Sequence, residues 1–126
     1  MIHSIAVSHK TTAGEVSFGE TDQVGNSEQK FAGIVPAGSI DFAVPITLTA
    51  SHIRSMVLHS SQPISIKTNS ITAPAQTLSL ADDLDAIWWS ASQTATNPIT
   101  ADITGTVYVT NNGQHNADVL LLFLLQ

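Results

Sequence analysis

Three closely spaced carboxylates, Asp82, Asp83 and Asp85, come nearest to a metal site in this chain. Calcium takes six to eight oxygen ligands, and carboxylates are common among them. A recognised calcium loop places such residues at its first, third and fifth positions and adds a glycine and a distal glutamate. That pattern is absent here. We therefore interpret the three residues as a turn in which Asp side chains bond nearby backbone amides.

The other residue types that carry chemistry are not arranged for it. The histidines lack both the i, i+4 helix spacing and the short clusters that zinc sites use. The chain has no cysteine, and it has no Gly-x-Ser-x-Gly nucleophile elbow. We expect a protein that is not an enzyme, with no catalytic residue, no metal and no cofactor. The histidines are His3, His9, His52, His59 and His115.

Trp88 and Trp89 are the candidate binding aromatics. Because they are adjacent, a strand would point their rings to opposite faces of a sheet. An exposed tryptophan can stack on a sugar or anchor a protein interface. Loops of the same chain could instead cover both rings, and both interpretations stay open.

Composition predicts one domain, residues 1–126, with a polar but weakly charged surface. A chain of 126 residues buries about 65–70% of its unfolded surface when it folds. Charged residues make up 11%, against about 25% in typical soluble domains, while serine and threonine supply 28 positions. With a net charge of −6 and four basic residues, the basic patch expected of a nucleic-acid-binding protein is missing.

Neither a signal peptide nor a membrane helix is expected. The first residues lack the basic region and the long apolar stretch of a secretory signal. The strongly apolar run Val119–Leu125 has seven residues, far fewer than the about 20 that a membrane helix needs. We expect synthesis in the cytoplasm and no membrane partner.

Short β-strands are the elements that would position these residues. Alternation of apolar residues from Ile40 to Leu48 predicts a strand with one face in the core. Pro45 cannot donate a ladder hydrogen bond, which places this strand at a sheet edge or at a bulge. A helical turn over 49–54, capped by Thr49 or Ser51, is expected to follow.

The second half of the chain predicts further strands at close spacing, over 56–58, 64–66, 78–80, 86–89, 99–103 and 106–110, with a kink at Gly105. Asn112-Gly113 is typical of a hairpin turn and predicts that strands 106–110 and 117–125 are neighbours. About eight short strands without a helix–strand alternation favour an all-β fold, an antiparallel β-sandwich or a jelly-roll-like one.

The N-terminal segment has a looser pattern. Residues 1–7 predict a first strand, after which Gly14, Gly19 and Gly25 stand among polar residues. Residues 8–30 are expected to form a long loop, a weak hairpin around Val16 and Phe18, or an extended arm that orders on docking.

The last strand is apolar on both faces. Val119, Leu121, Phe123 and Leu125 occupy one face, and Leu120, Leu122 and Leu124 occupy the other. An antiparallel sandwich covers only one face of a strand, so the second face needs cover from this chain or from another subunit. We expect an oligomer, and the candidate interface residues are Val119, Leu120, Leu122 and Leu124.

Short motifs between residues 53 and 126 resemble small accessory virion proteins of tailed bacteriophages. Those with a known place in the particle include capsid decoration or cement proteins, whose β-rich subunits, commonly trimers, sit on the major capsid lattice. The leucine-rich ending Val119–Leu125 departs from the usual form. The motifs are Ile64–Asn69, Ile87-Trp88-Trp89, Asn97-Pro98, Asp102-Ile103-Thr104 and Val107–Thr110.

The resemblance implies a non-enzymatic bacteriophage virion structural protein. Its expected role is that of a capsid decoration or cement protein on the capsid surface, which bridges and stabilises major capsid protein subunits as a homotrimer. The alternative is a tail or fibre module that binds a host-surface glycan through Trp88 or Trp89.

Overall fold

The computed structural model describes residues 2–11, 14–81, 86–89 and 97–126. These residues form ten strands and one 3₁₀ helix, η1 (Ala50–His52). None of them belongs to a helix long and apolar enough to cross a membrane. The strands are β1 (Ile2–Thr11), β2 (Gly14–Val24), β3 (Ser27–Val35), β4 (Phe42–Leu48), β5 (Ile53–Ser60), β6 (Ile64–Thr68), β7 (Thr77–Leu80), β8 (Ala86–Trp89), β9 (Ile103–Asn111) and β10 (Ala117–Leu125).

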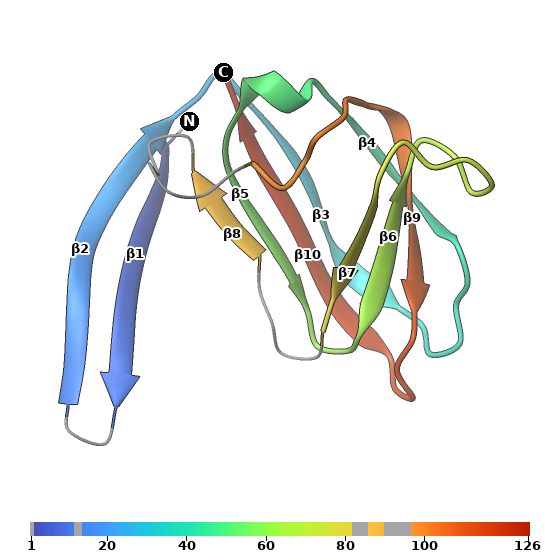
Figure 1. Ribbon diagram of the computed structural model, residues 1–126, viewed down its shortest axis with the longest axis horizontal. Coiled ribbons are helices and arrows are strands. Elements are labelled where there is room, and N and C mark those ends of the chain that lie inside the picture. Colours follow the sequence, from blue (N-terminus) through green and yellow to red (C-terminus); the bar gives the residue numbers. More distant parts are fainter. Residues whose placement is uncertain (1, 12–13, 82–85, 90–96) are drawn as a thin grey trace.

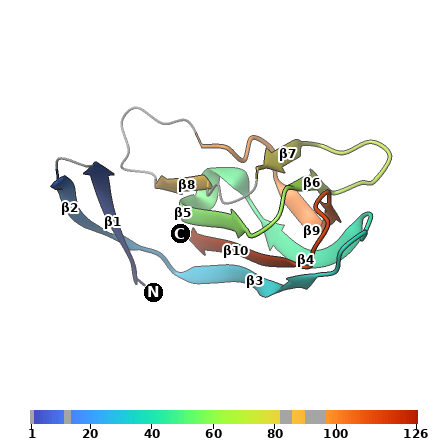
Figure 2. The same cartoon turned by 90° about the horizontal axis from the view of Figure 1, so that it is seen from below.

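Strands β3 to β10 form two antiparallel four-stranded sheets that pack face to face (Figure 1 and Figure 2). One sheet has the order β3-β10-β5-β8 and the other β4-β9-β6-β7. Every connection along the chain from β3 to β10 passes from one sheet to the other, except that between β6 and β7. This is a jelly-roll arrangement, and the all-β, jelly-roll-like fold expected from the sequence is confirmed.

The core lies between the two sheets and consists mainly of aliphatic side chains. Alternate residues supply it, so that in β4 Val44, Ile46 and Leu48 are buried and the residues between them are exposed. A void of ≈ 10 Å³ lies beside Leu58 and Phe123, which is about the space that a single water needs. Apart from this small void, side chains fill the interior of the sandwich there.

β4 lies at a sheet edge, as Pro45 predicts. The alternation from Ile40 does not extend as far as expected, because Ile40 lies outside the strand and is 78% exposed. Asp41 has a φ of 55°, a left-handed conformation that breaks the extended chain. The backbone N–H of Asp41 donates to Thr110 Oγ1 at 3.1 Å, which holds this turn in place.

The expected hairpin between residues 106–110 and 117–125 is wrong. β9 pairs with β4 and β6, whereas β10 pairs with β3 and β5 in the other sheet. The type I′ turn that Asn-Gly favours needs positive φ at both central positions, and type II′ needs it at the first; neither Asn112 nor Gly113 has positive φ. Residues 99–103 also differ from the expectation, since the strand begins at Ile103 and continues through Gly105.

Asn111 explains why the chain leaves the sheet after β9. Its side chain is only 5% exposed, and its Nδ2 donates to Val35 O at 3.1 Å and to His115 O at 2.8 Å. Its Oδ1 accepts from Gly113 N at 2.9 Å. Because Val35 ends β3 in the opposite sheet, these hydrogen bonds link the end of β9 to the other layer and shape the crossing.

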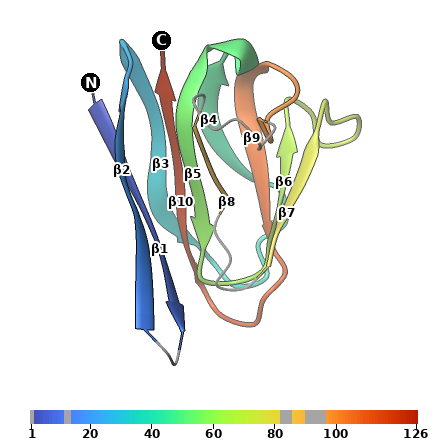
Figure 3. The same ribbon diagram turned by 60° about the vertical axis from the view of Figure 1, so that its left-hand side comes forward.

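The N-terminal segment forms a hairpin, β1–β2, and then enters the sandwich as β3. Val16 and Phe18 lie in β2, so the hairpin was among the expected forms, whereas a long loop was not correct for residues 14–24. The hairpin lies along the outer side of the sheet β3-β10-β5-β8 (Figure 2 and Figure 3). It diverges from that sheet towards its tip (Figure 1).

Candidate interaction face

We define the apolar outer face as the side of the sheet β3-β10-β5-β8 that points away from the core. Strand register arranges it in rows: Lys30, Leu122 and Val57 form one row, and Ala32, Leu120 and His59 the next. Asp118 lies opposite Ile34 beyond these rows. Its remaining described members, at the other end of the sheet, are Glu28, Leu124 and Ser55.

One end of this face is closed within the chain. Leu124 is 0% exposed, although it points away from the core between the sheets. A Cβ atom on Gly25 would lie 2.8 Å from Leu124 Cγ and would also collide with Leu125 O. Asn26 N donates to Leu125 O at 2.7 Å. The base of the β1–β2 hairpin is therefore fixed tightly against the end of β10, and only glycine fits at position 25.

The other end of the face is open. Leu120 and Leu122 are half-buried, and Ile34 is 56% exposed. A shallow hollow of ≈ 240 Å³ lies beside Leu120 and Ile34, and its described walls are mostly apolar. The exposed Asp118 lines this hollow, and the exposed Lys30 lies on the other side of Ala32. The burial thus decreases along β10 from Leu124 towards Leu120.

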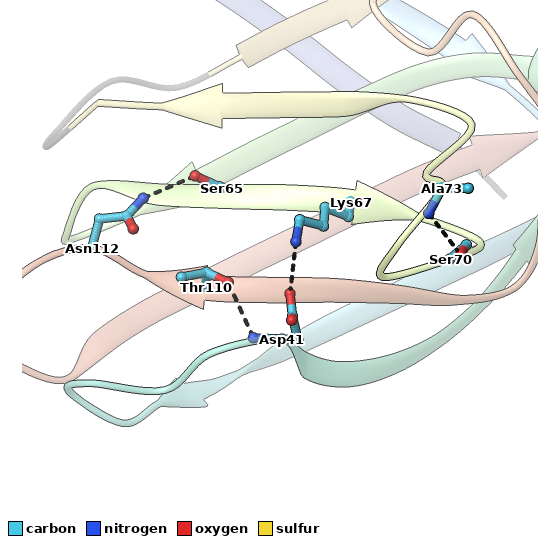
Figure 4. A network of polar contacts seen from close by, with 7 residues as sticks. All are labelled: Asp41, Ser65, Lys67, Ser70, Ala73, Thr110 and Asn112. Atoms are coloured by element: carbon cyan, nitrogen blue, oxygen red, sulfur yellow. Dashed lines mark hydrogen bonds and ion pairs between the residues drawn. The ribbon is translucent and has the colours of Figure 1, made fainter.

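The polar outer face, on the far side of the sheet β4-β9-β6-β7, has the opposite character. Lys67 Nζ lies 3.3 Å from Asp41 Oδ1, and Asn112 Nδ2 donates to Ser65 Oγ at 2.9 Å (Figure 4). At the end of the neighbouring loop, Ala73 N donates to the Ser70 hydroxyl. Hydroxyl, amide and charged groups there bond to one another.

A second hollow, of ≈ 490 Å³, opens at the end of the sandwich beside His52 and Asp102. Its walls combine threonines such as Thr47 with apolar residues such as Leu48 and Ile103. Asp102 Oδ1 accepts from Ala50 N at 2.8 Å, which satisfies an N–H at the start of η1. The carboxylate in this hollow therefore has a structural role.

The structure separates the four predicted interface residues into two groups. Val119 is 3% exposed and belongs to the core, and Leu124 is covered by its own chain. Leu120 and Leu122 are the two that reach the surface. The second apolar face of β10 is thus covered by this chain at one end and open at the other.

The tryptophans are described only in their backbone, and the three aspartates are not among the described residues. β8 pairs with β5, so that the backbone of Trp88 lies opposite Met56 and that of Trp89 opposite Ser55. The side chains of both tryptophans lie outside the described part of the structure, as do Asp82, Asp83 and Asp85. Among the described residues, no group of three or more histidine, cysteine or carboxylate side chains could hold a metal.

Sequence reasoning missed the contribution of β3 to this face. Lys30, Ala32 and Ile34 alternate with Phe31 and Val35, which is a strand pattern. Residues 27–30 are all polar, so the start of this strand at Ser27 carries no apolar alternation, and residues 8–30 were expected to form a loop, a hairpin or an arm. The apolar outer face therefore includes residues of β3 beside those of β10, whereas the sequence predicted only the contribution of β10.

Comparisons with known proteins add a distant structural likeness. No family model and no curated protein matches the chain. A solved structure, the cupin domain of Cnp3 from Schizosaccharomyces pombe, is similar over 98% of this chain and 84% of its own, with 13% sequence identity and a TM-score of 0.42.

Proposed function

We propose that this protein is a non-enzymatic structural subunit of a bacteriophage particle, of the capsid decoration type. In this role it binds major capsid protein subunits on the assembled shell and bridges them. The observation that carries the proposal is the contrast between the two outer faces of the jelly roll. One face is apolar and partly open at Leu120 and Leu122, and the other is rich in hydroxyl and amide groups.

The apolar outer face supports a role in assembly. Full burial of a leucine contributes about 1.5–3 kcal/mol, so covering the exposed parts of Leu120, Leu122 and Ile34 favours association. Exposed patches of this kind, rimmed by polar residues, are typical of protein interaction sites. Lys30 and Asp118 supply that rim.

The polar outer face supports broad contact with a shell. Its hydroxyl and amide side chains can exchange hydrogen bonds with water for hydrogen bonds with a neighbour, at little net cost in free energy. Standard interfaces between proteins have a polar rim and about one hydrogen bond per 100–200 Å². A decoration protein needs such surfaces and no reacting group, and the resemblance of residues 53–126 to accessory virion proteins agrees with this role.

The experiment compares phage particles with and without this protein. A ligand that binds only the assembled shell stabilises it by mass action, so particles without the protein should disassemble at a lower temperature or after a milder osmotic shock. Adding the purified protein back should restore the difference. If bare particles are equally robust but no longer adsorb to host cells, the cement role is wrong and glycan binding by a tail module is the better account.

A further inference from the structure

We propose that the open end of the apolar outer face binds the same face of a second copy of this chain, through a two-fold axis that lies in the plane of the contact and crosses the strands at the Ala32–Leu120 pair. The contact deepens the proposed function, because it states how subunits associate. It is tested on the purified protein alone, so its failure leaves the particle experiment intact.

Strand register makes this face self-complementary. Ala32 lies opposite Leu120; on one side of this pair Lys30 lies opposite Leu122, and on the other Ile34 lies opposite Asp118. All of these residues belong to the apolar outer face. Lys30 and Asp118 are on different strands and on opposite sides of the Ala32–Leu120 pair, which therefore lies midway between them.

An axis in the plane of the contact, perpendicular to the line that joins Lys30 and Asp118, exchanges the positions of these two residues across the contact. Lys30 of each copy then meets Asp118 of the other, and the two ion pairs flank an apolar centre. An isologous contact needs this property, since the same patch must complement itself. Both side chains are exposed in the single chain, and Lys30 has no ion pair among the described residues.

The apolar centre supplies the driving force. Leu120 and Ile34 border the shallow hollow of ≈ 240 Å³, and the half-buried Leu122 extends the patch along β10. The centre of a stable interface is apolar and depleted in charge, with polar groups around it. The β1–β2 hairpin closes the Leu124 end and diverges from the sheet towards its tip (Figure 1). At the other end Lys30, Ile34 and Asp118 are exposed.

The two-fold contact also bears on the number of subunits. An isologous face joins copies in pairs, whereas a trimer needs a head-to-tail contact between two different patches. The apolar outer face therefore predicts a dimer in place of the trimer that the resemblance implies.

The test is charge reversal with the full chain, read by analytical ultracentrifugation. Each single variant, Lys30→Glu or Asp118→Lys, places two like charges opposite each other at both ends of the contact. Each should raise the dissociation constant of the dimer by about tenfold or more. The double variant Lys30→Glu/Asp118→Lys restores opposite charges and should recover most of the affinity. The effect of the single variants should weaken at high salt.

Matched variants separate this face from general surface effects. Ile34→Asp should abolish the dimer, whereas Ile40→Asp should not, because Ile40 is equally apolar and more exposed but lies outside the face. Thermal melts confirm that each variant folds. A wild-type chain that stays monomeric at all concentrations, as it would if its own hairpin covered the face, overturns the proposal. A dimer whose dissociation constant is unchanged by both charge reversals also overturns it. A monomeric wild type that binds bare particles, when its Leu120→Asp variant does not, overturns it as well, since the shell would then occupy the face.

Discussion

The two outer faces of the sandwich belong to sheets of equal size but differ in chemistry. On the polar outer face, Ser65 and Lys67 of β6 point outward, opposite Thr110 and Tyr108 of β9. On the apolar outer face, Leu120 and Leu122 occupy the corresponding positions of β10. An antiparallel sheet with one solvated face normally alternates apolar and polar residues. The polar face follows that rule, and the apolar face departs from it, which marks it as a surface that needs cover.

The largest effect should come from the closed end of the apolar outer face. Leu124→Ala removes a side chain that is 0% exposed and leaves a cavity, so we expect a loss of about 2–5 kcal/mol in the free energy of unfolding. Thr104→Ala, at an exposed position of the polar face, should change it by no more than about 0.5 kcal/mol. Urea denaturation measures both. Equal effects would show that Leu124 is not covered by its own chain.

The hairpin base gives an intermediate effect. Gly25→Ala introduces a Cβ against Leu124 and Leu125 O, and overpacking of this kind costs about 1–3 kcal/mol. Limited proteolysis should then cut the β1–β2 hairpin sooner than in the wild type. Gly105→Ala is the control in the other sheet, because its Cβ would meet nothing within 4 Å. A hairpin equally protected in Gly25→Ala would contradict the tight contact at Gly25.

The polar face should give the smallest effect. Lys67→Ala removes the ion pair between Lys67 and Asp41. The Lys67 side chain is 32% exposed and that of Asp41 is 18% exposed. Because solvent screens such a pair, the expected loss is about 0–1 kcal/mol, and it should shrink further at high salt. Denaturation of the variant at low and high salt measures it. A loss as large as that of Leu124→Ala would break the contrast between the faces.

Much of the fold could be predicted because its pattern is local. Alternation along β4 and the proline within it correctly predicted a strand at a sheet edge. The double apolar pattern of β10 indicated a second apolar face, which this chain covers at Leu124 and leaves open at Leu120 and Leu122. The exposure of Ile40 was missed because the left-handed backbone of Asp41 depends on its contact with Thr110, far along the chain.

Long-range hydrogen bonds account for the other errors. Asn112-Gly113 has the composition of a hairpin turn, but Asn111 bonds to Val35 across the sandwich and directs β10 to the other sheet. The interaction face was predicted only through β10. Lys30, Ala32 and Ile34 join it by strand pairing, which no local pattern reveals.

The most direct test of the contrast between the two outer faces is sedimentation equilibrium of Leu120→Asp and Thr106→Asp. Both positions are half-buried and point outward, on β10 and β9 respectively. We predict that the wild type and Thr106→Asp reach about twice the 13.3 kDa mass of one chain, and that Leu120→Asp stays at the mass of a single chain. A Leu120→Asp variant that dimerises like the wild type, or a Thr106→Asp variant that alone dissociates, would contradict the assignment of the apolar outer face as the interaction surface.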